Sequence, residues 1–445
     1  MRVLLIKPNI GRMEHSLYVD EGRMEPLQLG VIAGLLPKGI DVALIDDRME
    51  EIPYDDPADL VAITVETFTA RRAYEIADRF RKRKIPVILG GFHPTLIPEE
   101  AMQHADSIFM HDAEWLLPQV IDDLKNRGKL NAIYKSKPGI GQCKGVLPRR
   151  DLFKNKGYLP VTLMQFGRGC SFKCEFCAVS VFFNQKNYTR PVDEMVREIK
   201  DQAGKVIFFV DDNIVSDRQK AKELFRALIP LKKNWVSQAC LDMLEDKELM
   251  ELMVKSRCLG NVIGFESINP KSLNSMKKAS NLQTGFDNYE TQIKQLRNYG
   301  FQTWAAFTLG HDWDDQDSLE KTLEFSFKHK FAFAAYNILL PYPNTPLYKR
   351  LQQENRLLYD GKWWLHPEYR FNYAAHKPKL MTADELTEGV FKIRKKWNSN
   401  ASIIRRFFDL KTNMRTLQNA IIYWSYNPLF QKETFKKHGM KFGLK

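Results

Sequence analysis

The sequence predicts an α/β protein in which two α/β domains are followed by a helical carboxyl-terminal region. Short apolar runs alternate with amphipathic helical patterns over residues 1–130, and the same alternation returns over residues 161–345. Such alternation indicates βαβ units and parallel sheets. Residues 131–160 are rich in Gly, Pro and Lys and lack periodicity, so we expect a linker there. Residues 346–445 show mostly helical patterns and an excess of basic side chains.

The first domain is expected to be doubly wound and of Rossmann type. Its strand candidates are Val3–Lys7, Val42–Asp46, Leu60–Val65, Val87–Leu89 and Ser107–Met110. An amphipathic pattern predicts a helix over residues 69–83. Ligands of such domains bind beyond the carboxyl ends of the strands. We therefore expect a ligand near residues 7–9, 67–69 and 90–95.

The second domain is expected to be a partial (β/α)6 TIM barrel. Its strand candidates are Thr162–Phe166, Val206–Val210, Trp235–Ala239, Asn261–Phe265, Gln302–Leu309 and Ala335–Leu340. Helical patterns fall between them, at about residues 193–202, 216–228, 246–256, 285–299 and 315–329. Barrel enzymes carry their chemistry at the carboxyl-terminal mouth, so functional residues should follow the strands.

Cys170, Cys174 and Cys177 form a C-x3-C-x2-C motif directly after the first barrel strand. Three thiolates at this spacing can ligate three irons of a 4Fe–4S cluster and leave the fourth iron open, whereas electron-transfer clusters normally take four cysteines. Zinc is the alternative, but it normally takes a fourth His or Cys, and none follows within twenty residues. A secreted disulfide framework would be denser. We expect ordinary buried thiols at the remaining cysteines: Cys143, Cys240 and Cys258.

The motif resembles that of the radical S-adenosylmethionine (SAM) superfamily, and Phe176 matches the aromatic residue that usually precedes the last cysteine. The resemblance implies a 4Fe–4S cluster on Cys170, Cys174 and Cys177, with SAM bound beside Phe176. In that superfamily the open iron chelates the amino and carboxylate groups of SAM. Reduction of the cluster cleaves SAM to a 5′-deoxyadenosyl radical, which abstracts a hydrogen atom from an unactivated carbon.

Other segments resemble the superfamily in order along the chain. Asp211 and Asp212 end the second barrel strand, where the resemblance implies groups that hold the SAM amino group; they could instead cap the next helix. Glu266 and Ser267 resemble the GxES element near the ribose and carboxylate of SAM. Residues 309–312 resemble the fifth-strand glycine element without its second glycine and proline, and residues 341–346 match the loop that usually lines the adenine pocket.

The whole layout resembles the cobalamin-binding-domain class of radical SAM enzymes, which includes methyltransferases, hopanoid methylases and the anaerobic cyclase of chlorophyll synthesis. Residues 25–30 (EPLQLG) and 90–99 (GGFHPTLIPE) match this class. The segment from residue 346 resembles the extension of the hopanoid-methylase branch. The resemblance implies a cobalamin-binding-type first domain, with cobalamin beside these residues: Gly90, Gly91, His93 and Thr95.

Two departures affect the cobalamin assignment. The sequence has no D-x-H-x-x-G motif, so it offers no lower cobalt ligand in the manner of methionine synthase. The acidic GEGE-like element of the class is replaced by HDAE at residues 111–114. From the residues alone, Gly90 and Gly91 allow either close backbone approach to a ligand or a tight turn without one. A histidine such as His93 is more often a structural hydrogen-bonding residue than a metal ligand.

We therefore expect an enzyme that functionalises an unactivated carbon of a small-molecule or lipid-like substrate. Cobalamin-dependent methyl transfer is favoured over radical rearrangement or cyclisation, and an electron donor such as flavodoxin or ferredoxin is implied. tRNA modification, and nucleic acid as a partner, are disfavoured because the first domain lacks a second cysteine triad and no RNA-binding module is expected after residue 346. A redox sensor is disfavoured because it has no use for an open iron and a SAM pocket.

Composition indicates a soluble, cytoplasmic protein, since 44% of residues are hydrophobic and no apolar run reaches the roughly 18 residues of a membrane span. The amino-terminal run MRVLLIKPN is too short for a signal peptide. Of the net charge of +13, +11 falls in residues 391–445, with 13 Lys or Arg against Asp409 and Glu433. Aromatic residues are interleaved with these charges. The segment is expected either to bind an anionic partner, such as the inner membrane face or nucleic acid, or to form a solubilising face of helices on the barrel.

Overall fold

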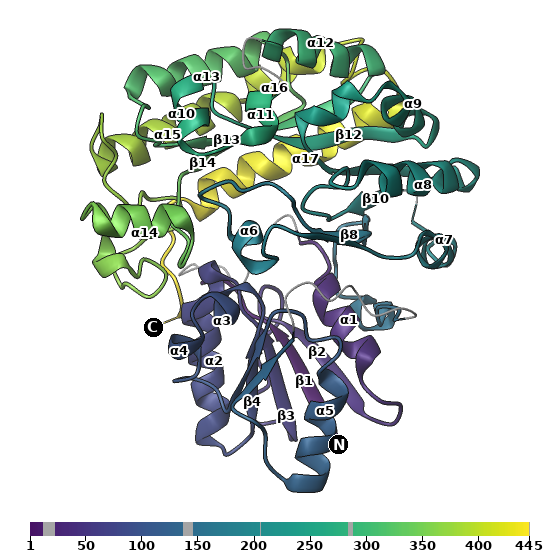
Figure 1. The fold of residues 1–445 in the computed structure, drawn as a ribbon, viewed down its shortest axis with the longest axis vertical. Coiled ribbons are helices and arrows are strands. Elements are labelled where there is room, and N and C mark those ends of the chain that lie inside the picture. The colour runs from purple at the N-terminus through teal and green to yellow at the C-terminus, as the bar shows by residue number, and fades with distance from the viewer. Residues whose placement is uncertain (12–22, 137–145, 205, 284–287, 445) are drawn as a thin grey trace.

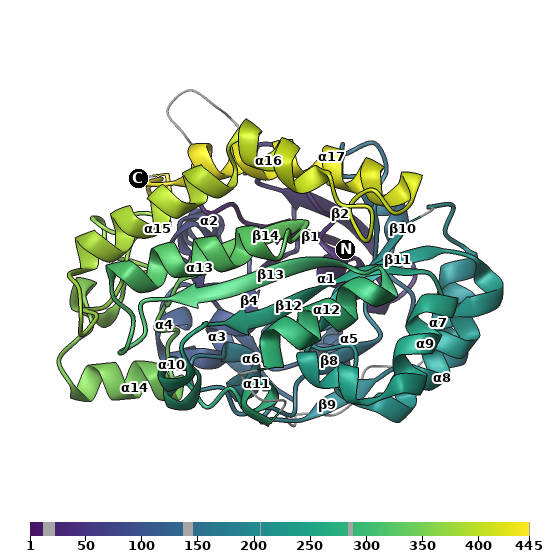
Figure 2. The ribbon, with the colours of Figure 1, turned by 90° about the horizontal axis from the view of Figure 1, so that it is seen from above.

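The computed structural model describes residues 1–11, 23–136, 146–204, 206–283 and 288–444. Cys143 lies outside these residues. Two parallel sheets dominate the molecule: the first lies in the lower part of Figure 1, and the second lies with its helices in the upper part. The carboxyl-terminal helices run along one edge of the molecule, as Figure 2 shows.

The first sheet contains six parallel strands in the order β2-β1-β3-β4-β5-β6. They are β1 (Arg2–Lys7), β2 (Asp41–Asp46), β3 (Leu60–Thr64), β4 (Val87–Gly90), β5 (Ser107–Met110) and β6 (Ile133–Lys135). β2 pairs with one edge of β1, whereas β3 and the later strands lie on the other side. In doubly wound sheets, ligands bind outside the carboxyl ends of the strands at such a switch point.

Five of these strands confirm the predicted ones within a few residues, but β6 departs from the prediction. It lies within residues 131–160, which the sequence assigns to a linker. β6 pairs in parallel with β5 at the sheet edge, and only Tyr134 of its three residues is buried. One buried side chain makes no apolar run, so periodicity gives no signal for this strand.

Helices cover both faces of the first sheet. They are α1 (Leu27–Leu35), α2 (Ala70–Lys82), α3 (Phe92–Leu96), α4 (Pro98–Ala101) and α5 (Leu117–Asp122). Successive side chains of a strand point to opposite faces. Leu4 and Ile6 of β1 accordingly join one core with α2, whereas Val3 and Leu5 join another with α1 and α5.

The second sheet contains six parallel strands in the sequential order β14-β13-β12-β11-β10-β7. They are β7 (Thr162–Met164), β10 (Val206–Phe209), β11 (Asn234–Ala239), β12 (Cys258–Glu266), β13 (Gln302–Leu309) and β14 (Phe333–Ile338). The accompanying helices are α6 (Ala178–Phe182), α7 (Val192–Lys200), α8 (Arg218–Leu228), α9 (Lys247–Lys255), α10 (Pro270–Ser275), α11 (Ala279–Gln283), α12 (Tyr289–Tyr299) and α13 (Gln316–Lys328). The six strands and five helices that the sequence predicts are present, with boundaries moved by a few residues; residues 285–287 of the helix predicted over 285–299 lie outside the described residues.

The carboxyl-terminal region is more than a helical extension. Its helices are α14 (Pro346–Gln353), α15 (Ala383–Trp397), α16 (Asn400–Phe407) and α17 (Leu417–Lys437). Trp363 and Trp364, between α14 and α15, and Phe442, after α17, are buried in the core of the first domain beside α2. This region therefore joins both sheets. No helix in the described part of the chain is long and apolar enough to cross a membrane.

Candidate functional site

A loop between two short antiparallel strands, β8 (Gly167–Gly169) and β9 (Asn187–Thr189), carries the three clustered cysteines. Gly169, directly before Cys170, has a φ of 83°, and a Cβ there would lie 2.1 Å from the carbonyl oxygen of Lys186. Only glycine fits this position. The carboxylate of Asp212 accepts a hydrogen bond from the Gly169 N–H at 2.8 Å. The cysteine loop is thereby fixed to the carboxyl end of β10.

Of the three thiols, Cys174 is buried, and Cys170 and Cys177 are partly exposed. Burial raises the pKa of each thiol, that of Cys174 to about 12, and the charge of Lys278 acts in the opposite direction on all three. The thiols must therefore lose protons when they bind a metal cluster. A single zinc ion would need its ligands close around one point. The part of the chain that the structure describes contains no group of three His, Cys, Asp or Glu side chains placed in that way.

Lys278 is a buried cation beside the cysteine loop. Its ammonium donates to Glu266 Oε1 at 2.9 Å, and Glu266 Oε2 accepts a hydrogen bond from Thr308 at 2.8 Å. Burial opposes the charge of Lys278, but Glu266 and the nearby thiols raise its pKa well above the ordinary value. A positive charge therefore lies next to the three cysteines.

Asp211 and Asp212 lie at the carboxyl end of β10, and their oxygens bind backbone N–H groups. Asp211 accepts hydrogen bonds from Phe166 and Gly167 at 2.8 and 2.6 Å, and its side chain is almost fully buried. Burial raises the pKa of Asp211 to about 8, and the two hydrogen bonds oppose that rise. Neither aspartate caps the next helix, because the cap of α8 is Asp217. The two carboxylates thus position the strand and loop that lead to the cysteines.

The other predicted SAM residues surround the same loop. Glu266 ends β12 with a φ of 64°, and the Oγ of Ser267 accepts a hydrogen bond from the Asn269 N–H at 3.0 Å, which shapes the turn into α10. Phe176 packs against the second-domain core and α14, and its ring centroid lies 6.4 Å from that of His311. Direct contact of Phe176, Glu266 and Ser267 with SAM stays a prediction.

The two remaining matched segments also follow strands. The N–H groups of Gly310 and His311 both donate to Asp314 at 3.0 Å, and the carbonyl oxygen of Pro341 accepts a hydrogen bond from Trp363 at 2.9 Å. These contacts hold the turns after β13 and β14. The glycine element thus keeps its turn although a second glycine is missing.

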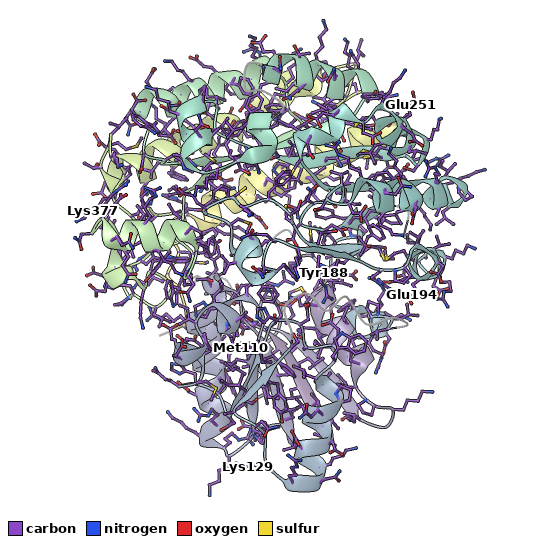
Figure 3. All side chains as sticks on the ribbon, viewed as in Figure 1. Met110, Lys129, Tyr188, Glu194, Glu251 and Lys377 are labelled. Carbon is purple, nitrogen blue, oxygen red and sulfur yellow. The ribbon has the colours of Figure 1, made fainter. Side chains whose placement is uncertain are left out.

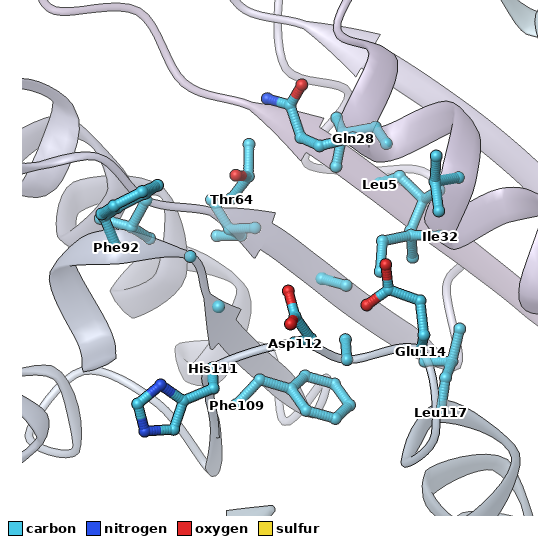
Figure 4. Close-up of a pocket in the computed structure, with 18 of the residues that line it drawn as sticks. Leu5, Gln28, Ile32, Thr64, Phe92, Phe109, His111, Asp112, Glu114 and Leu117 are labelled. Atoms are coloured by element: carbon cyan, nitrogen blue, oxygen red, sulfur yellow. The ribbon is translucent and has the colours of Figure 1, made fainter. Parts of the chain in front are cut away.

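A cavity of about 380 Å³ lies at the switch point between β1 and β3. Its first-domain lining includes Val3, Leu5, Gln28, Ile32, Ala62, Thr64, Gly90, Gly91, Phe92, Phe109, Asp112 and Glu114. Figure 4 shows many of these side chains around the ends of the strands. The second domain contributes Gln165, Arg168, Phe182, Phe183, Val210 and Asp212. The two domains therefore share one cavity, and Asp212 connects it to the cysteine loop.

Arg168, two residues before Cys170, links the domains across this cavity. Its guanidinium pairs with Asp112 at 3.0 Å and also with Glu114. Both acids come from the HDAE element at residues 111–114. Burial raises the pKa of Asp112 to about 6; Glu114 adds to the rise, and Arg168 opposes it. The HDAE element departs from the GEGE-like element but still supplies two acidic side chains at the cavity.

The predicted cobalamin residues divide into two groups. Gly90 and Gly91 line the cavity, whereas His93 and Thr95 are not among the described residues that line it. His93 is fully buried, with Nε2 3.1 Å from Glu100 Oε1, and Thr95 donates to the Gly91 carbonyl oxygen at 2.9 Å. His93 and Thr95 thus stabilise the turn after β4. The structure gives His93 the hydrogen-bonding role that is usual for such a residue.

Sequence reasoning missed Lys278, Arg168 and the position of Cys240. Cys240 directly follows β11 and lies close enough to Cys170 and Cys174 to interact electrostatically with them. Its place after a parallel strand was the available signal, because such residues face the barrel mouth. Lys278 and Arg168 gave no comparable signal, since their roles depend on partners distant in the sequence.

Comparison with known proteins adds an independent observation. Residues 164–326 match the model of a family described as the Radical SAM superfamily. This range begins in β7, ends in α13 and includes the cysteine loop. These residues therefore form a radical SAM domain. Such a domain implies a 4Fe–4S cluster and SAM as cofactors.

Relatives of this protein match most of its length. It is 29% identical to the bacteriochlorophyllide d C-12(1)-methyltransferase of Chlorobaculum tepidum, over 91% of this chain and 88% of that protein. It is 25% identical to the hopanoid C-2 methylase of Rhodopseudomonas palustris, over 81% of this chain and 71% of that protein. Its fold is similar to that of the cobalamin-dependent SAM radical enzyme OxsB with aqua-cobalamin bound, with a TM-score of 0.68, 14% identity, and coverage of 98% of this chain and 72% of that one.

Proposed function

We propose that this protein is a radical SAM enzyme that methylates an unactivated carbon, with cobalamin as the methyl carrier. The observation that carries the proposal is the connection between two sites. Arg168 and Asp212 both line the switch-point cavity, and both are tied to the loop that begins at Cys170. A cofactor in the cavity and a cluster on the loop would therefore face a common space. Methyl transfer is the activity named for two similar proteins.

We infer that the first sheet and its helices form a Rossmann-like, cobalamin-binding-type domain. Its doubly wound strand order, with a cavity at the switch point, supports this assignment. We infer that the second sheet is a partial (β/α)6 TIM barrel, which the sequential order of six parallel strands supports. Domain limits at residues 130, 161 and 345 stay predictions.

The residues around the loop fit a cluster with SAM. Cys170, Cys174 and Cys177 would hold three irons, and the charge of Lys278 would favour their thiolate forms. Asp212 would keep the loop in place through Gly169. When bound, the cluster and SAM supply the radical that removes a hydrogen atom from the substrate.

The lining of the cavity offers apolar walls and a polar rim to part of a large, flat ligand. Leu5 and Ile32 supply apolar walls, while Gln28, Asp112 and Arg168 offer polar groups suited to the amide side chains of cobalamin. At Gly90 and Gly91 the backbone is bare, so a ring system can approach it closely. When bound, cobalamin supplies the methyl group. These residues would orient it toward the cysteine loop.

We propose a small-molecule or lipid-like substrate, because one similar protein is named for a hopanoid and another for a bacteriochlorophyllide. An electron donor such as flavodoxin or ferredoxin would reduce the cluster. Radical rearrangement or cyclisation without methyl transfer is the alternative, and experiment must distinguish it from cobalamin-dependent methyl transfer.

Anaerobic reconstitution followed by assay tests the radical chemistry. We expect about four irons and four sulfides per chain, and 5′-deoxyadenosine from SAM and a strong reductant. Replacing Cys170, Cys174 and Cys177 together by Ala should abolish the cluster and SAM cleavage. The matched control replaces Cys143, Cys240 and Cys258 by Ala and should keep the cluster. A triple variant of the motif that still made 5′-deoxyadenosine would contradict the assignment.

Cobalamin binding separates methyl transfer from the alternative. Hydroxocobalamin should co-elute with the protein in gel filtration, and label from methyl-labelled SAM should enter the product. If no cobalamin co-elutes, methyl transfer loses its carrier, and rearrangement or cyclisation becomes the better assignment.

A further inference from the structure

Exposed apolar side chains gather where α16, the following turn and α17 meet. We call this surface the α16–α17 patch; it consists of Ile404, Phe408, Leu410, Leu417, Ile421 and Trp424. Leu410 and Leu417 are each 79% exposed, so neither packs on the protein. The α17 members are three or four residues apart and so share one helix face. Single exposed apolar residues are normal, but a group of them marks an interaction site.

Aromatic contact joins the two helices at this surface. The ring centroid of Phe407 on α16 lies 5.0 Å from that of Trp424 on α17. Figure 2 shows α16 and α17 next to each other along one edge of the molecule. Other residues of the same helices, Ile403 and Tyr423, are buried and pack inward. The helices therefore pack on the second domain and still present an apolar outer face.

Basic side chains border the patch. Arg405, Lys411 and Arg415 are exposed. Lys411 lies 3.4 Å from the side-chain oxygen of Asn298, and Arg415 donates to the carbonyl oxygen of Tyr299. The structure gives none of the three a carboxylate partner among the residues it describes. Their charges therefore act on the surrounding solvent.

Acidic side chains of residues 400–424 do not offset this charge. Asp409 is the one acidic residue between positions 400 and 424 of the sequence. It is buried, and it pairs with Arg297 at 2.8 Å. The outer surface is therefore both apolar and positive, which suits the headgroups and acyl chains of an anionic membrane.

A second cavity, of about 260 Å³, lies behind α17. Its lining includes Phe208, Val236, Val262 and Trp304 from the sheet and Ile422 and Phe430 from α17. Val206, Gln302 and Phe333, the first residues of β10, β13 and β14, also line it, whereas Glu266 and Thr308 lie at the carboxyl ends of their strands near the cysteine loop. Ile421 belongs both to the patch and to the cavity lining. The cavity therefore reaches the surface beside the patch.

We propose that the α16–α17 patch docks the enzyme on an anionic membrane and that the cavity behind α17 takes up an apolar chain of a membrane lipid. Charge complementarity favours the membrane, and the exposed leucines would find acyl chains there. Nucleic acid would satisfy the basic residues but would leave those leucines in water. Uptake rests on the proposed function, because it would bring a lipid-like substrate into the sheet whose opposite end carries the cysteine loop.

Co-sedimentation of the full-length protein with vesicles tests docking. We expect binding to phosphatidylcholine mixed with phosphatidylglycerol, weaker binding at high salt, and little binding to phosphatidylcholine alone. The double variant Leu410→Ser with Lys411→Glu should bind about ten-fold more weakly. The matched control is Leu380→Ser with Lys377→Glu, a change of the same type near α14, where Lys377 is labelled in Figure 3. It should bind like the unchanged protein.

Three outcomes would overturn docking. They are equal binding of the two double variants, equal behaviour toward neutral and anionic vesicles, and tighter salt-sensitive binding to tRNA than to anionic vesicles. The last would instead support a nucleic-acid partner. Thermal unfolding of each variant shows whether a loss of binding reflects a loss of folding.

Titration with cis-parinaric acid, a fluorescent apolar chain, tests uptake. We expect saturable binding that Val262→Phe and Val236→Phe each weaken about ten-fold, because each fills the cavity from a different strand. Vesicle binding should not change in these variants. Absence of saturable binding, or indifference to both variants, would overturn uptake. Neither the vesicle co-sedimentation nor the cis-parinaric acid titration uses SAM or cobalamin. A failure of docking or uptake is therefore distinct from a failure of labelled methyl transfer.

Discussion

Lys278 is the side chain that most affects the charge around the cysteine loop. It is buried, it binds Glu266, and it acts on all three thiols. Replacing Lys278 by Met leaves a buried carboxylate unpaired, so we expect a loss of about 3 kcal/mol in the free energy of unfolding and less cluster after reconstitution. The measurements are chemical denaturation of the apo protein and iron content.

A second substitution separates stability from function. Adding Glu266→Gln to Lys278→Met removes the unpaired charge and should restore most of the stability, whereas SAM cleavage should stay low. Lys277→Met, at the exposed neighbouring residue, is the matched control and should behave like the unchanged protein. Full recovery of SAM cleavage in the double variant would show that Lys278 has only a structural role.

Glu100 is expected to make the free energy of unfolding depend on pH. Burial alone would raise the pKa of Glu100, but hydrogen bonds from His93 and Trp364 lower it from 4.5 to about 2. A carboxyl whose pKa is lowered by folding stabilises the fold above its unfolded pKa and loses that contribution as pH falls through the folded one. The site is partly solvated, so we expect about 2 kcal/mol at neutral pH.

The comparison of Glu100→Gln with the unchanged protein tests this dependence. The stability difference should be constant above pH 4.5 and should shrink as pH falls toward 2. Glu99→Gln, on the exposed side of the same helix α4, is the control and should show no such trend. Urea denaturation at several pH values measures the stability difference. A difference that stays constant down to pH 2 would contradict the pairing of Glu100 with His93 and Trp364.

Single residues were predictable where the signal is local. The spacing of Cys170, Cys174 and Cys177 is contained in eight positions and needs no knowledge of the fold. Lys278 acts through Glu266, twelve residues away, and Arg168 through Asp112, 56 residues away. Such partners become visible only when the strands are placed next to each other. His93 belongs to the same group, because its partner Glu100 also accepts a hydrogen bond from Trp364, which is distant in the sequence.

The turn between β4 and α3 offers a test at the scale of an element. Gly91 has a φ of 112°, and a Cβ there would lie 2.9 Å from the Val65 carbonyl oxygen. At Gly90 a Cβ would lie 3.3 Å from Phe109 Cβ, which a small shift can relieve. We expect Gly91→Ala to destabilise the protein by about 2 kcal/mol and Gly90→Ala by less than about 1 kcal/mol.

Both glycines line the cavity, so cobalamin titration adds a second measurement. If the ligand approaches the bare backbone, both variants should weaken cobalamin binding although only Gly91→Ala strains the turn. Weakened binding in Gly91→Ala alone would mean that the pair serves the turn and not the ligand.

Elements of regular length were predictable, but of the four three-residue strands in the described part of the chain only β7 was. The parallel strands with several apolar residues, such as β3 and β13, lie within a few residues of their predicted positions. β6, β8 and β9 have three residues each. Three residues contain too little periodicity to distinguish a strand from a loop. The short pair β8–β9 nevertheless flanks and positions the cysteine loop. The sequence therefore could not predict the strands that hold this part of the site.

At the scale of the whole molecule, Arg168 joins the two domains across the shared cavity. Arg168→Met would leave Asp112 and Glu114 without their counter-charge, so we expect a loss of about 3 kcal/mol. The pKa of Asp112, already about 6, should rise further. A carboxyl whose pKa is raised by folding costs stability once it ionises, so the defect should be larger at pH 8 than at pH 5.

Arg218→Met is the control for this change. Arg218 pairs with Asp242 and Glu245 at a more exposed position, where such pairs contribute about 1 kcal/mol or less. Thermal unfolding at the two pH values measures both variants. Equal, pH-independent losses in Arg168→Met and Arg218→Met would contradict a special role for the interdomain pair.

The burial of Phe442 in the first domain also has a consequence for synthesis on the ribosome. Phe442 packs in the core beside α2, with its ring 6.1 Å from that of Phe68, and the Gly443 N–H donates to the Ile10 carbonyl oxygen at 2.9 Å. Translation releases residues 1–130 long before residue 442 leaves the exit tunnel. The first domain therefore cannot complete its core while the second domain is being made, so its final packing follows the release of residue 442 from the tunnel. The first domain of the nascent chain therefore stays incompletely packed until both domains that line the shared cavity have been synthesised.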